Sequence, residues 1–375
     1  MEKDRDLSFD ALRGLAIIAV VATHGIYLGG SPDNPGFIYY RQLLNFAVPV
    51  FFFMSGYWSS REEIASLSGY KTFLTRRLPR VLVPYLFWSL VLIGYPAIRT
   101  GDVDGYRMIF KLLTGGACMG YYFLIILAQL YILTPVLMYL NRKLGGYGLL
   151  LVFVFNMASF LAVYLSRLFN VIGHIPAALP FYSWIIYYEM GLFMTDRREG
   201  AAAGSKIRFF ILPAILFSLL VSMLEAGVIA SKYSNPGFAN FPVKYSTFLY
   251  SACVIFGFIF GREYFRRLPK LLSTIGYYSF GIYLIHMIVL GGVVVIFQNS
   301  GAIRSFQPLY QLILVVITLS ICLVLISASR KLLPEFLCSK ILGFGSRREH
   351  SEYAYRPTEK SERAKVDIGC GAEEA

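Results

Sequence analysis

Charged residues are scarce in this sequence. Only 15% of its 375 residues are Asp, Glu, Lys or Arg, whereas 57% are hydrophobic. A water-soluble domain of this length needs a polar exterior, which such a composition does not supply. A soluble globular protein is therefore excluded, and we expect lipid to be the main solvent of the chain.

Cysteine and the common catalytic motifs are also scarce or missing. The five cysteines form no C-x-x-C pair, so they define neither a disulfide framework nor a metal site. The chain contains no G-x-S-x-G, H-E-x-x-H or G-x-x-x-x-G-K motif, and no G-x-G-x-x-G after a strand. A covalent serine mechanism or a metal is not indicated, and we expect no bound cofactor.

Long apolar runs, in contrast, are abundant. Ten windows are long enough to cross the hydrocarbon core of a bilayer as helices. They cover residues 11–28, 42–58, 81–98, 121–140, 146–166, 179–195, 208–230, 245–261, 274–297 and 307–329. The predicted fold class is all-α, a polytopic transmembrane bundle of about ten helices, and the predicted location is the cell membrane as a multi-pass protein.

Basic residues are distributed unevenly between alternate loops. If the N-terminus is cytosolic, the inner segments before the tail hold 17 Lys and Arg residues and the outer loops hold eight, Arg41 among them. Because cytoplasmic loops carry the excess of basic residues, this inequality predicts that both termini are cytosolic. The same distribution explains the net charge of +13, so we expect no nucleic-acid partner.

The composition changes near Gly343. The residues that follow are polar and rich in Glu, Lys, Arg and Ser, with little apolar surface to offset the entropy of folding. We therefore predict a transmembrane domain over residues 1–342 and a disordered cytosolic tail over residues 343–375.

Two ionisable residues lie in the first apolar span, Arg13 and His24. They are eleven residues apart, so a helix would place both on one face, about 16 Å apart along its axis. Asp10 lies three residues before Arg13 and can pair with it across one turn. An interfacial role is the alternative for Asp10 and Arg13, because arginine can reach the headgroups. His24 lies too deep for that, and a neutral imidazole there can act as a general base.

These residues belong to a recognisable pattern. The motif F-D-x-L-R-G at 9–14, followed by His24, closely resembles the opening of the acyltransferase-3 family of integral-membrane acyltransferases. Further landmarks follow in the family's order: P-V-F-F-F-M-S-G-Y at 49–57, R-R-L-P-R at 76–80, Y-Y-F-L at 121–124 and Y-S-F-G-I-Y-L-I-H at 278–286. The resemblance covers residues 9 to about 330.

The sequence departs from the family pattern in two respects. Phe123 stands where members often carry Trp, and the extra extracytoplasmic hydrolase-like domain of some members is absent. We therefore expect transfer to be completed within the membrane domain or by a separate extracytoplasmic partner enzyme.

The resemblance implies an acyl-CoA donor, most simply acetyl-CoA, that is reached from the cytosol. Arg76, Arg77 and Arg80 lie at the predicted cytosolic mouth, where guanidinium groups can clamp phosphates. Arg77 and Arg80 share a helical face and are the preferred pair. Ordinary anchoring of basic residues on the cytosolic side is the alternative.

Four further polar residues within apolar spans are candidates for the acceptor site or tunnel. Glu225 is preferred as the acceptor-side carboxylate, whereas Glu189 has a structural ion pair with a loop arginine as its alternative. Tyr283 and His286 are three residues apart and share one helical face. They are candidates for the same tunnel or for a packed, hydrogen-bonded pair.

The predicted function is that of an O-acyltransferase, most simply an O-acetyltransferase. It would move an acyl group from cytosolic acyl-CoA to a hydroxyl of a cell-envelope carbohydrate or glycolipid, with membrane lipid around it. In this prediction His24 accepts the hydroxyl proton, while Arg13 and the Arg77/Arg80 pair position the donor. The alternatives are a transporter or exporter without covalent chemistry, which also uses midplane charges, and an inactive scaffold.

Overall fold

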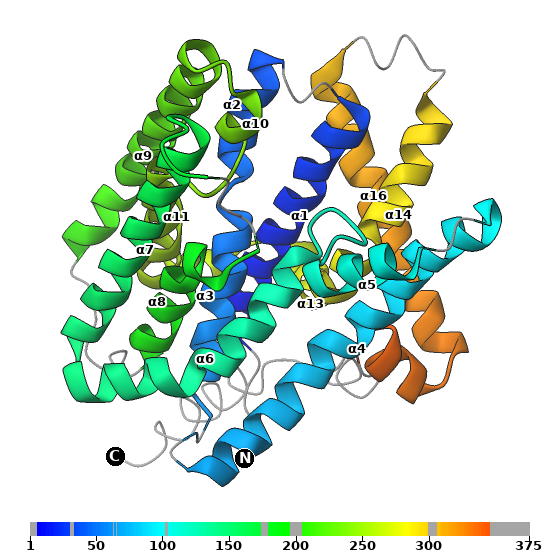
Figure 1. The fold of residues 1–375 in the computed structure, drawn as a ribbon, viewed down its shortest axis with the longest axis horizontal. Coiled ribbons are helices and arrows are strands. Elements are labelled where there is room, and N and C mark those ends of the chain that lie inside the picture. Colours follow the sequence, from blue (N-terminus) through cyan, green and yellow to red (C-terminus); the bar gives the residue numbers. More distant parts are fainter. Residues whose placement is uncertain are drawn as a thin grey trace, which may run out of the picture.

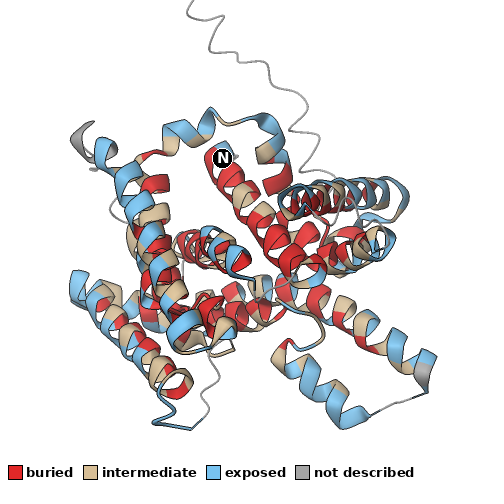
Figure 2. Cartoon of the chain, turned by 90° about the horizontal axis from the view of Figure 1, so that it is seen from above, coloured by how far each residue is buried: buried red, intermediate tan, exposed pale blue. Residues whose placement is uncertain are grey.

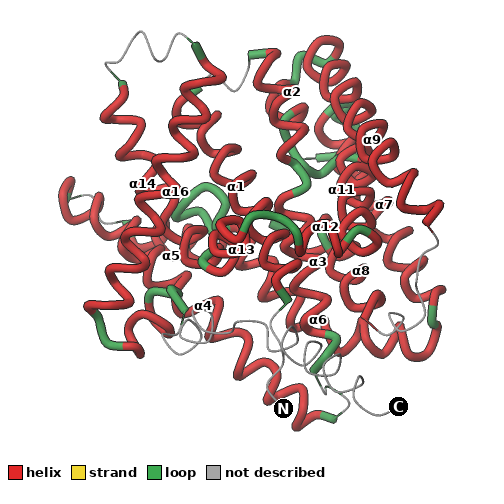
Figure 3. The backbone as a smooth tube through the Cα atoms, turned by 180° about the vertical axis from the view of Figure 1, so that it is seen from behind, coloured by secondary structure: helices red, strands yellow, loops and turns green. Residues whose placement is uncertain are grey.

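The computed structural model describes residues 6–30, 34–62, 64, 66–101, 104–173, 179–195, 205–298 and 306–345. Within these ranges every regular element is a helix (Figure 3). The all-α prediction is thereby confirmed. Residues 346–375, on which most of the predicted tail falls, lie outside the described ranges.

Eight helices of the described part are long and apolar enough to cross a membrane. They are α1 (Leu7–Gly29), the α2–α3 pair (Pro35–Leu44 and Ala47–Ser59), α4 (Leu67–Thr100), α6 (Tyr122–Leu144), α7 (Gly146–Arg167), α9 (Ser205–Lys232), α14 (Ser279–Phe297) and α16 (Gln307–Leu332). The predicted spans at 179–195 and 245–261 contain the shorter helices α8 (Ile185–Thr195) and α11 (Tyr245–Phe260). The chain is therefore a polytopic bundle, and ten crossings stay a prediction.

Several short helices differ from the predicted pattern. They are α5 (Gly105–Thr114), the 3₁₀ turn η1 (Phe181–Ser183), α10 (Pro236–Ala239), α12 (Arg262–Arg266), α13 (Lys270–Tyr277) and the π-helical turn η3 (Leu337–Ile341). The α5 helix lies where the sequence predicts a loop, and it buries none of its residues. Averaging hydropathy over a window finds uniformly apolar helices but misses an exposed helix that combines apolar and basic side chains.

The α1 helix runs through the middle of the bundle (Figure 1) and contacts α3, α13, α14 and α16. It is buried over most of its length, whereas helices at the rim expose their outer faces (Figure 2). Asp6 caps its start by accepting a hydrogen bond from the Ser8 amide. We call the end of the bundle where α1 begins the inner end, and the end where α1 finishes the outer end.

Close backbone contact fixes α13 across the start of α1. A Cβ atom added to Gly14 would overlap the backbone of Leu272, and one added to Gly276 would overlap the backbone of Asp10. Only glycine permits such an approach between two helices. Gly14, the final residue of the F-D-x-L-R-G motif, is therefore required by packing. The contact between α1 and α13 also holds the Asp10 region in place.

The α4 helix begins at Leu67, well before the predicted start at residue 81. Ser66 caps it, because the Ser66 side chain accepts a hydrogen bond of 3.0 Å from the Gly69 amide. The early turns carry Lys71 and several arginines, so an apolar window does not detect them. The extension places the R-R-L-P-R motif inside a helix at the inner end.

Candidate active site

A cavity of about 260 Å³ lies beside the outer half of α1. Five helices, α1, α2, α3, α6 and α14, and three connecting segments contribute to its described wall. The polar residues and the glycine that line it are Thr23, His24, Tyr27, Arg41, Asn45, Gly120, Tyr122 and Tyr283. Arg41 carries the only full charge among the described lining residues, and none of them is a carboxylate. We call this space the His24 cavity.

His24 is 7% exposed and packs against a second histidine from α14. The ring centroids of His24 and His286 are 5.2 Å apart. Gly120 adopts φ +97°, and a Cβ atom there would lie 3.2 Å from His24 Nε2, so glycine lets the chain pass close to the imidazole. The other ring nitrogen, Nδ1, is buried and has no hydrogen-bond partner among the described residues.

The tautomer of His286 follows from its backbone contacts. Its Nδ1 lies 2.7 Å from the Tyr283 carbonyl oxygen and 3.1 Å from that of Ile282. Carbonyl oxygens only accept hydrogen bonds, so Nδ1 carries the proton and Nε2 is an acceptor. This Nε2 is buried and has no partner within the described part of the chain.

Tyr283 ties α14 to the segment before α6. Its hydroxyl donates a hydrogen bond to the Gly120 carbonyl oxygen, directly beside His24. The structure thus brings His24, Tyr283 and His286 together, although they come from two helices that are far apart in the sequence. An acceptor hydroxyl in the His24 cavity would meet a neutral imidazole backed by a second imidazole.

Asp10 and Arg13 lie toward the inner end of α1. Arg13 Nη1 donates to Asp10 Oδ1 at 3.4 Å, and their side chains are 32% and 2% exposed. Neither residue lines the His24 cavity. The charges of Arg13 and Arg77 both act on the phenol of Tyr131 in α6, so these two guanidinium groups share one neighbourhood at the inner end.

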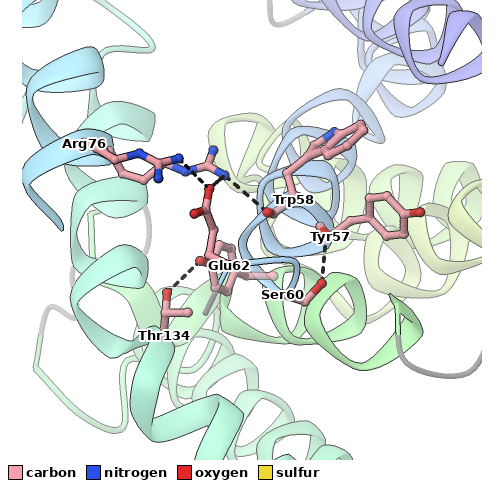
Figure 4. A network of polar contacts seen from close by, with 8 residues as sticks. Tyr57, Trp58, Ser60, Glu62, Arg76 and Thr134 are labelled. Atoms are coloured by element: carbon pink, nitrogen blue, oxygen red, sulfur yellow. Dashed lines mark hydrogen bonds and ion pairs between the residues drawn. The ribbon is translucent and has the colours of Figure 1, made fainter. Parts of the chain in front are cut away.

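The arginines of the R-R-L-P-R motif have different surroundings. Glu62 accepts a hydrogen bond from Arg76 at 3.3 Å (Figure 4). It accepts a second one from Arg77 at 3.0 Å. Arg77 also donates to the Trp58 carbonyl oxygen at 3.2 Å. Arg80 instead lines a separate cavity of about 430 Å³. Arg77 is not among the described residues that line this cavity, so the predicted Arg77/Arg80 pair does not share it.

The Arg80 cavity contains polar residues that the sequence did not single out. Tyr277, Tyr278, Glu335, Ser339 and Lys340 line it together with Arg80. The guanidinium of Arg330 lies over both tyrosine rings, 5.4 Å and 5.3 Å from their centroids. Tyr278 is the first residue of the Y-S-F-G-I-Y-L-I-H motif and Tyr277 directly precedes it, and this aromatic pair was the available signal.

The first turns of α14 separate the two cavities. Phe280 and Gly281 line the Arg80 cavity, whereas Tyr283 lines the His24 cavity and His286 packs on His24. Successive residues of a helix rise by about 1.5 Å, so the two spaces lie within a few turns of each other.

The two glutamates lie elsewhere. Glu225 accepts hydrogen bonds from the Tyr164 hydroxyl and from the hydroxyl and amide of Ser246, so it connects α9 to α7 and to the start of α11. Glu189 is fully buried, and neither of its oxygens has a hydrogen-bond partner among the described residues. Neither glutamate lines the His24 cavity. The loop after α8, where a partner arginine was expected for Glu189, lies outside the described residues.

Arg41 corrects one assumption made from the sequence. It was counted in an outer loop, but it lies within α2 and lines the His24 cavity. The reason is that the helix starts at Pro35, with the Asn34 side chain as its cap, and not at residue 42. The Asn-Pro pair was the signal for this earlier start.

A larger cavity of about 780 Å³ lies between α1, α2 and α16. Its lining is mainly apolar and includes no charged side chain and no histidine among the described residues. The Tyr40 phenol in its lining is a poorer base at neutral pH than an imidazole, so the smaller His24 cavity is the better candidate for chemistry. Groups of three metal-binding side chains are also absent from the described part of the chain.

The long apolar helices define a multi-pass membrane protein, and two histidines pack against each other in its interior. Comparison with known proteins specifies the class. Residues 6–327 match the family model described as the acyltransferase domain of the acyltransferase 3 type. The chain belongs to the acyltransferase 3 family and is a membrane-bound acyltransferase, which confirms the resemblance seen in the sequence.

One relative is YfiQ of Bacillus subtilis (strain 168), a protein named as a membrane-bound acyltransferase. The two chains are 26% identical over 268 residues, which cover 66% of this chain and 68% of YfiQ. No solved structure matches the chain at a significant level.

Proposed function

We propose that this acyltransferase takes an acyl group, most simply acetyl, from cytosolic acyl-CoA and transfers it to a hydroxyl of a cell-envelope carbohydrate or glycolipid. The observation that carries the proposal is the position of His24. It lines a cavity inside the membrane bundle, with His286 packed against its ring. A buried imidazole beside a closed cavity can deprotonate a hydroxyl where bulk water is excluded.

In the proposed reaction, His24 accepts the proton of the acceptor hydroxyl as that oxygen attacks the thioester carbonyl carbon. A tetrahedral intermediate forms and collapses when its carbon–sulfur bond breaks. The coenzyme A thiolate leaves and takes up the proton that the His24 imidazolium gives back. The products are an ester and free coenzyme A, so His24 is regenerated without a cofactor.

His286 has a role beside His24 in this proposal. An imidazolium has two N–H donors, so a protonated His24 needs an acceptor for Nδ1. The His24 Nδ1 and His286 Nε2 atoms both lack partners among the described residues, and their rings are packed together. We therefore treat His286 as a positioning residue whose Nε2 accepts the Nδ1–H of the imidazolium.

The donor is proposed to bind at the inner end. Arg80 and Lys340 line one cavity there together with Glu335, so two cations and one carboxylate face it, and the excess of positive charge suits the phosphates of coenzyme A. Arg76 and Arg77 share a single carboxylate, Glu62, so this cluster keeps a net positive charge. The Asp10–Arg13 pair lies at the same end, and the thioester would reach His24 past the start of α14.

Thioester loss measured on the purified full chain tests this function. The protein in lipid nanodiscs receives acetyl-CoA with and without an alkyl glycoside acceptor, and free thiol is followed over time. We expect thiol release that depends on the acceptor, together with an acceptor that gains one acetyl mass. Movement of a glycan across proteoliposomes without any thiol release would instead identify a transporter.

A further inference from the structure

We propose that Arg41 forms an anion-binding subsite, so that the acceptor presents a carboxylate or phosphate group at the outer side of the His24 cavity. This inference rests on the proposed function, because it names the class of molecule that His24 would deprotonate. It narrows the acceptor from any hydroxyl compound to an acidic sugar or a phosphate-bearing glycolipid.

The first observation is that the Arg41 side chain is held in position. Its Nε donates to Asn45 Oδ1 at 3.1 Å, and its guanidinium lies 5.1 Å from the centroid of the Tyr27 ring. Asn45 is fixed in turn, because its Nδ2 donates to Gln42 Oε1 at 3.1 Å. Arginine held on an aromatic face and by one hydrogen bond keeps its remaining N–H groups for a ligand.

A buried lysine extends the same network. Lys244 is fully buried, and its Nζ donates to Gln42 Oε1 at 2.8 Å and to the Ala239 carbonyl oxygen at 2.6 Å. Ser222 of α9 also donates to Gln42 Oε1, at 3.2 Å. The network anchors α2 to α9 and to the start of α11, and so it holds the helix that carries Arg41 in place.

The second observation is a free donor. Arg41 Nη1 is buried and has no hydrogen-bond partner among the described residues. No carboxylate is present among the described residues that line the His24 cavity. A guanidinium that is partly removed from water without a counter-anion is costly, and this cost is removed when a ligand supplies the anion. The cavity is therefore complementary to a negatively charged group.

The third observation is the side of His24 on which Arg41 lies. Tyr27, which the guanidinium covers, follows His24 by three residues, or about 4.5 Å farther along α1 toward the outer end. Arg13 and the Arg80 cavity, proposed for the donor, lie toward the inner end. The anion that Arg41 recognises therefore belongs to the acceptor and not to coenzyme A.

A guanidinium fork fits planar carboxylates and phosphates equally well, so the test uses both. Binding of hexyl glucoside, hexyl glucuronide and hexyl glucoside 6-phosphate is measured on the full chain in nanodiscs without acyl-CoA. We expect at least one anionic probe to bind about tenfold more tightly than the neutral one, which is the usual value of one charge-assisted contact. The probe that binds more tightly identifies the anion.

Arg41→Gln should abolish this preference and leave the affinity for hexyl glucoside unchanged. Arg41→Lys should keep only part of it, because an ammonium lacks the fork. The control is Arg107→Gln, which removes an exposed arginine that pairs with Asp104 outside the His24 cavity. This control should bind all three probes like the wild type. If Arg41→Gln does not fold, wild-type affinities in Arg41→Lys would overturn the proposal.

Two further results would overturn the Arg41 proposal. One is equal binding of the three probes by the wild type, and the other is an unchanged preference for the anionic probe in Arg41→Gln. An Arg41→Gln variant that binds every probe normally but turns over neutral and anionic acceptors more slowly would overturn it as well, since Arg41 would then act on the reacting oxygen. His24→Ala separates the two proposals, because it should lose transfer but keep the anion preference. A wild type with this preference but without transfer would refute the acyl transfer and support the subsite.

Discussion

His24 lies between two polar environments of different character. Toward the inner end, Arg13 pairs with Asp10, and Arg76 and Arg77 share Glu62. Toward the outer end, Arg41 has a free donor and no carboxylate in the described lining of its cavity. The two substrates of the proposed reaction therefore have separate binding regions on the two sides of one base.

Arg80→Ala should weaken acyl-CoA binding about tenfold, because it removes one charge-assisted contact to phosphate. Arg77→Ala should have a smaller effect, since Arg77 already pairs with Glu62 at 3.0 Å. Equilibrium binding of a non-hydrolysable acyl-CoA analogue measures both. Arg99→Ala, an exposed arginine at the opposite end of α4, is the matched control. If folded Arg80→Ala bound the acyl-CoA analogue with normal affinity, Arg80 would not bind the donor. It would then only help to fix the orientation of α4 in the membrane.

The sequence was sufficient to predict some of these residues and not others. Spacing within one helix predicts the Asp10–Arg13 pair and the shared face of Tyr283 and His286. It does not predict that His286 packs on His24, because this contact joins helices that are more than two hundred residues apart. Arg41 was missed because the earlier start of α2 moves it from a loop into the cavity wall.

Helix packing in this bundle depends on a few close backbone contacts. The α3 and α8 helices meet through two glycines, and a Cβ atom on Gly56 would overlap the backbone of Tyr188, while one on Gly191 would overlap that of Phe53. Such contacts are typical of helices that associate within lipid. Gly56 is the glycine of the P-V-F-F-F-M-S-G-Y segment, so helix packing accounts for the presence of glycine in that motif.

Gly56→Ala should lower the melting temperature of the detergent-purified protein, because the added methyl group forces the helices apart at a cost of about 1–3 kcal/mol. Gly94→Ala in α4 is the control. No atom lies within 4 Å of a Cβ placed there, so this change should be neutral or should stabilise by up to about 1 kcal/mol. Equal melting temperatures for both variants would contradict the packing of α3 on α8.

At the level of elements, hydropathy located most of the bundle. Each of the ten predicted windows contains helix, because long apolar segments have few other structures in a membrane. Short and amphipathic pieces were missed. The predicted span at 274–297 is divided at Tyr278 into α13 and α14, since α13 packs across α1 through Gly276, a contact that local hydropathy does not encode.

For the molecule as a whole, the orientation in the membrane determines which substrate comes from which side. Leu67 at the start of α4 and Tyr106 in α5 are highly exposed, with 83% and 81% of their surfaces accessible. A membrane-impermeant maleimide should label Tyr106→Cys in intact cells, whereas Leu67→Cys should react only after permeabilisation, as the distribution of basic residues predicts. The reverse labelling pattern would place the acyl-CoA side outside the cell and contradict the proposal.

Native cysteines set the background of this labelling experiment. Burial raises the pKa of the Cys118 thiol to about 11, so it stays protonated at neutral pH and reacts slowly. Cys370 lies outside the described residues and is replaced by serine in both variants. A parent protein with this single replacement should give little signal on either side of the membrane.

The packed part of the chain extends slightly beyond the predicted domain boundary. Trp88 Nε1 donates to the Leu342 carbonyl oxygen at 3.1 Å, and the Trp88 ring lies 6.1 Å from that of Phe344. A Cβ atom on Gly343 would meet the side chains of Leu284 and Phe280. We therefore propose that the membrane domain includes residues 343–345 and that the predicted cytosolic tail follows them.

Single-turnover acyl transfer by His24 variants tests the central claim most directly. Donor affinity is measured first, so that a folding defect is not mistaken for lost chemistry. His24→Ala should bind acyl-CoA normally and transfer the acyl group about two to four orders of magnitude more slowly, which is the usual contribution of a positioned base. His24→Gln should be nearly as slow, because an amide can hold the hydroxyl but cannot take its proton. Near-normal turnover in His24→Gln would contradict the assignment of His24 as the general base.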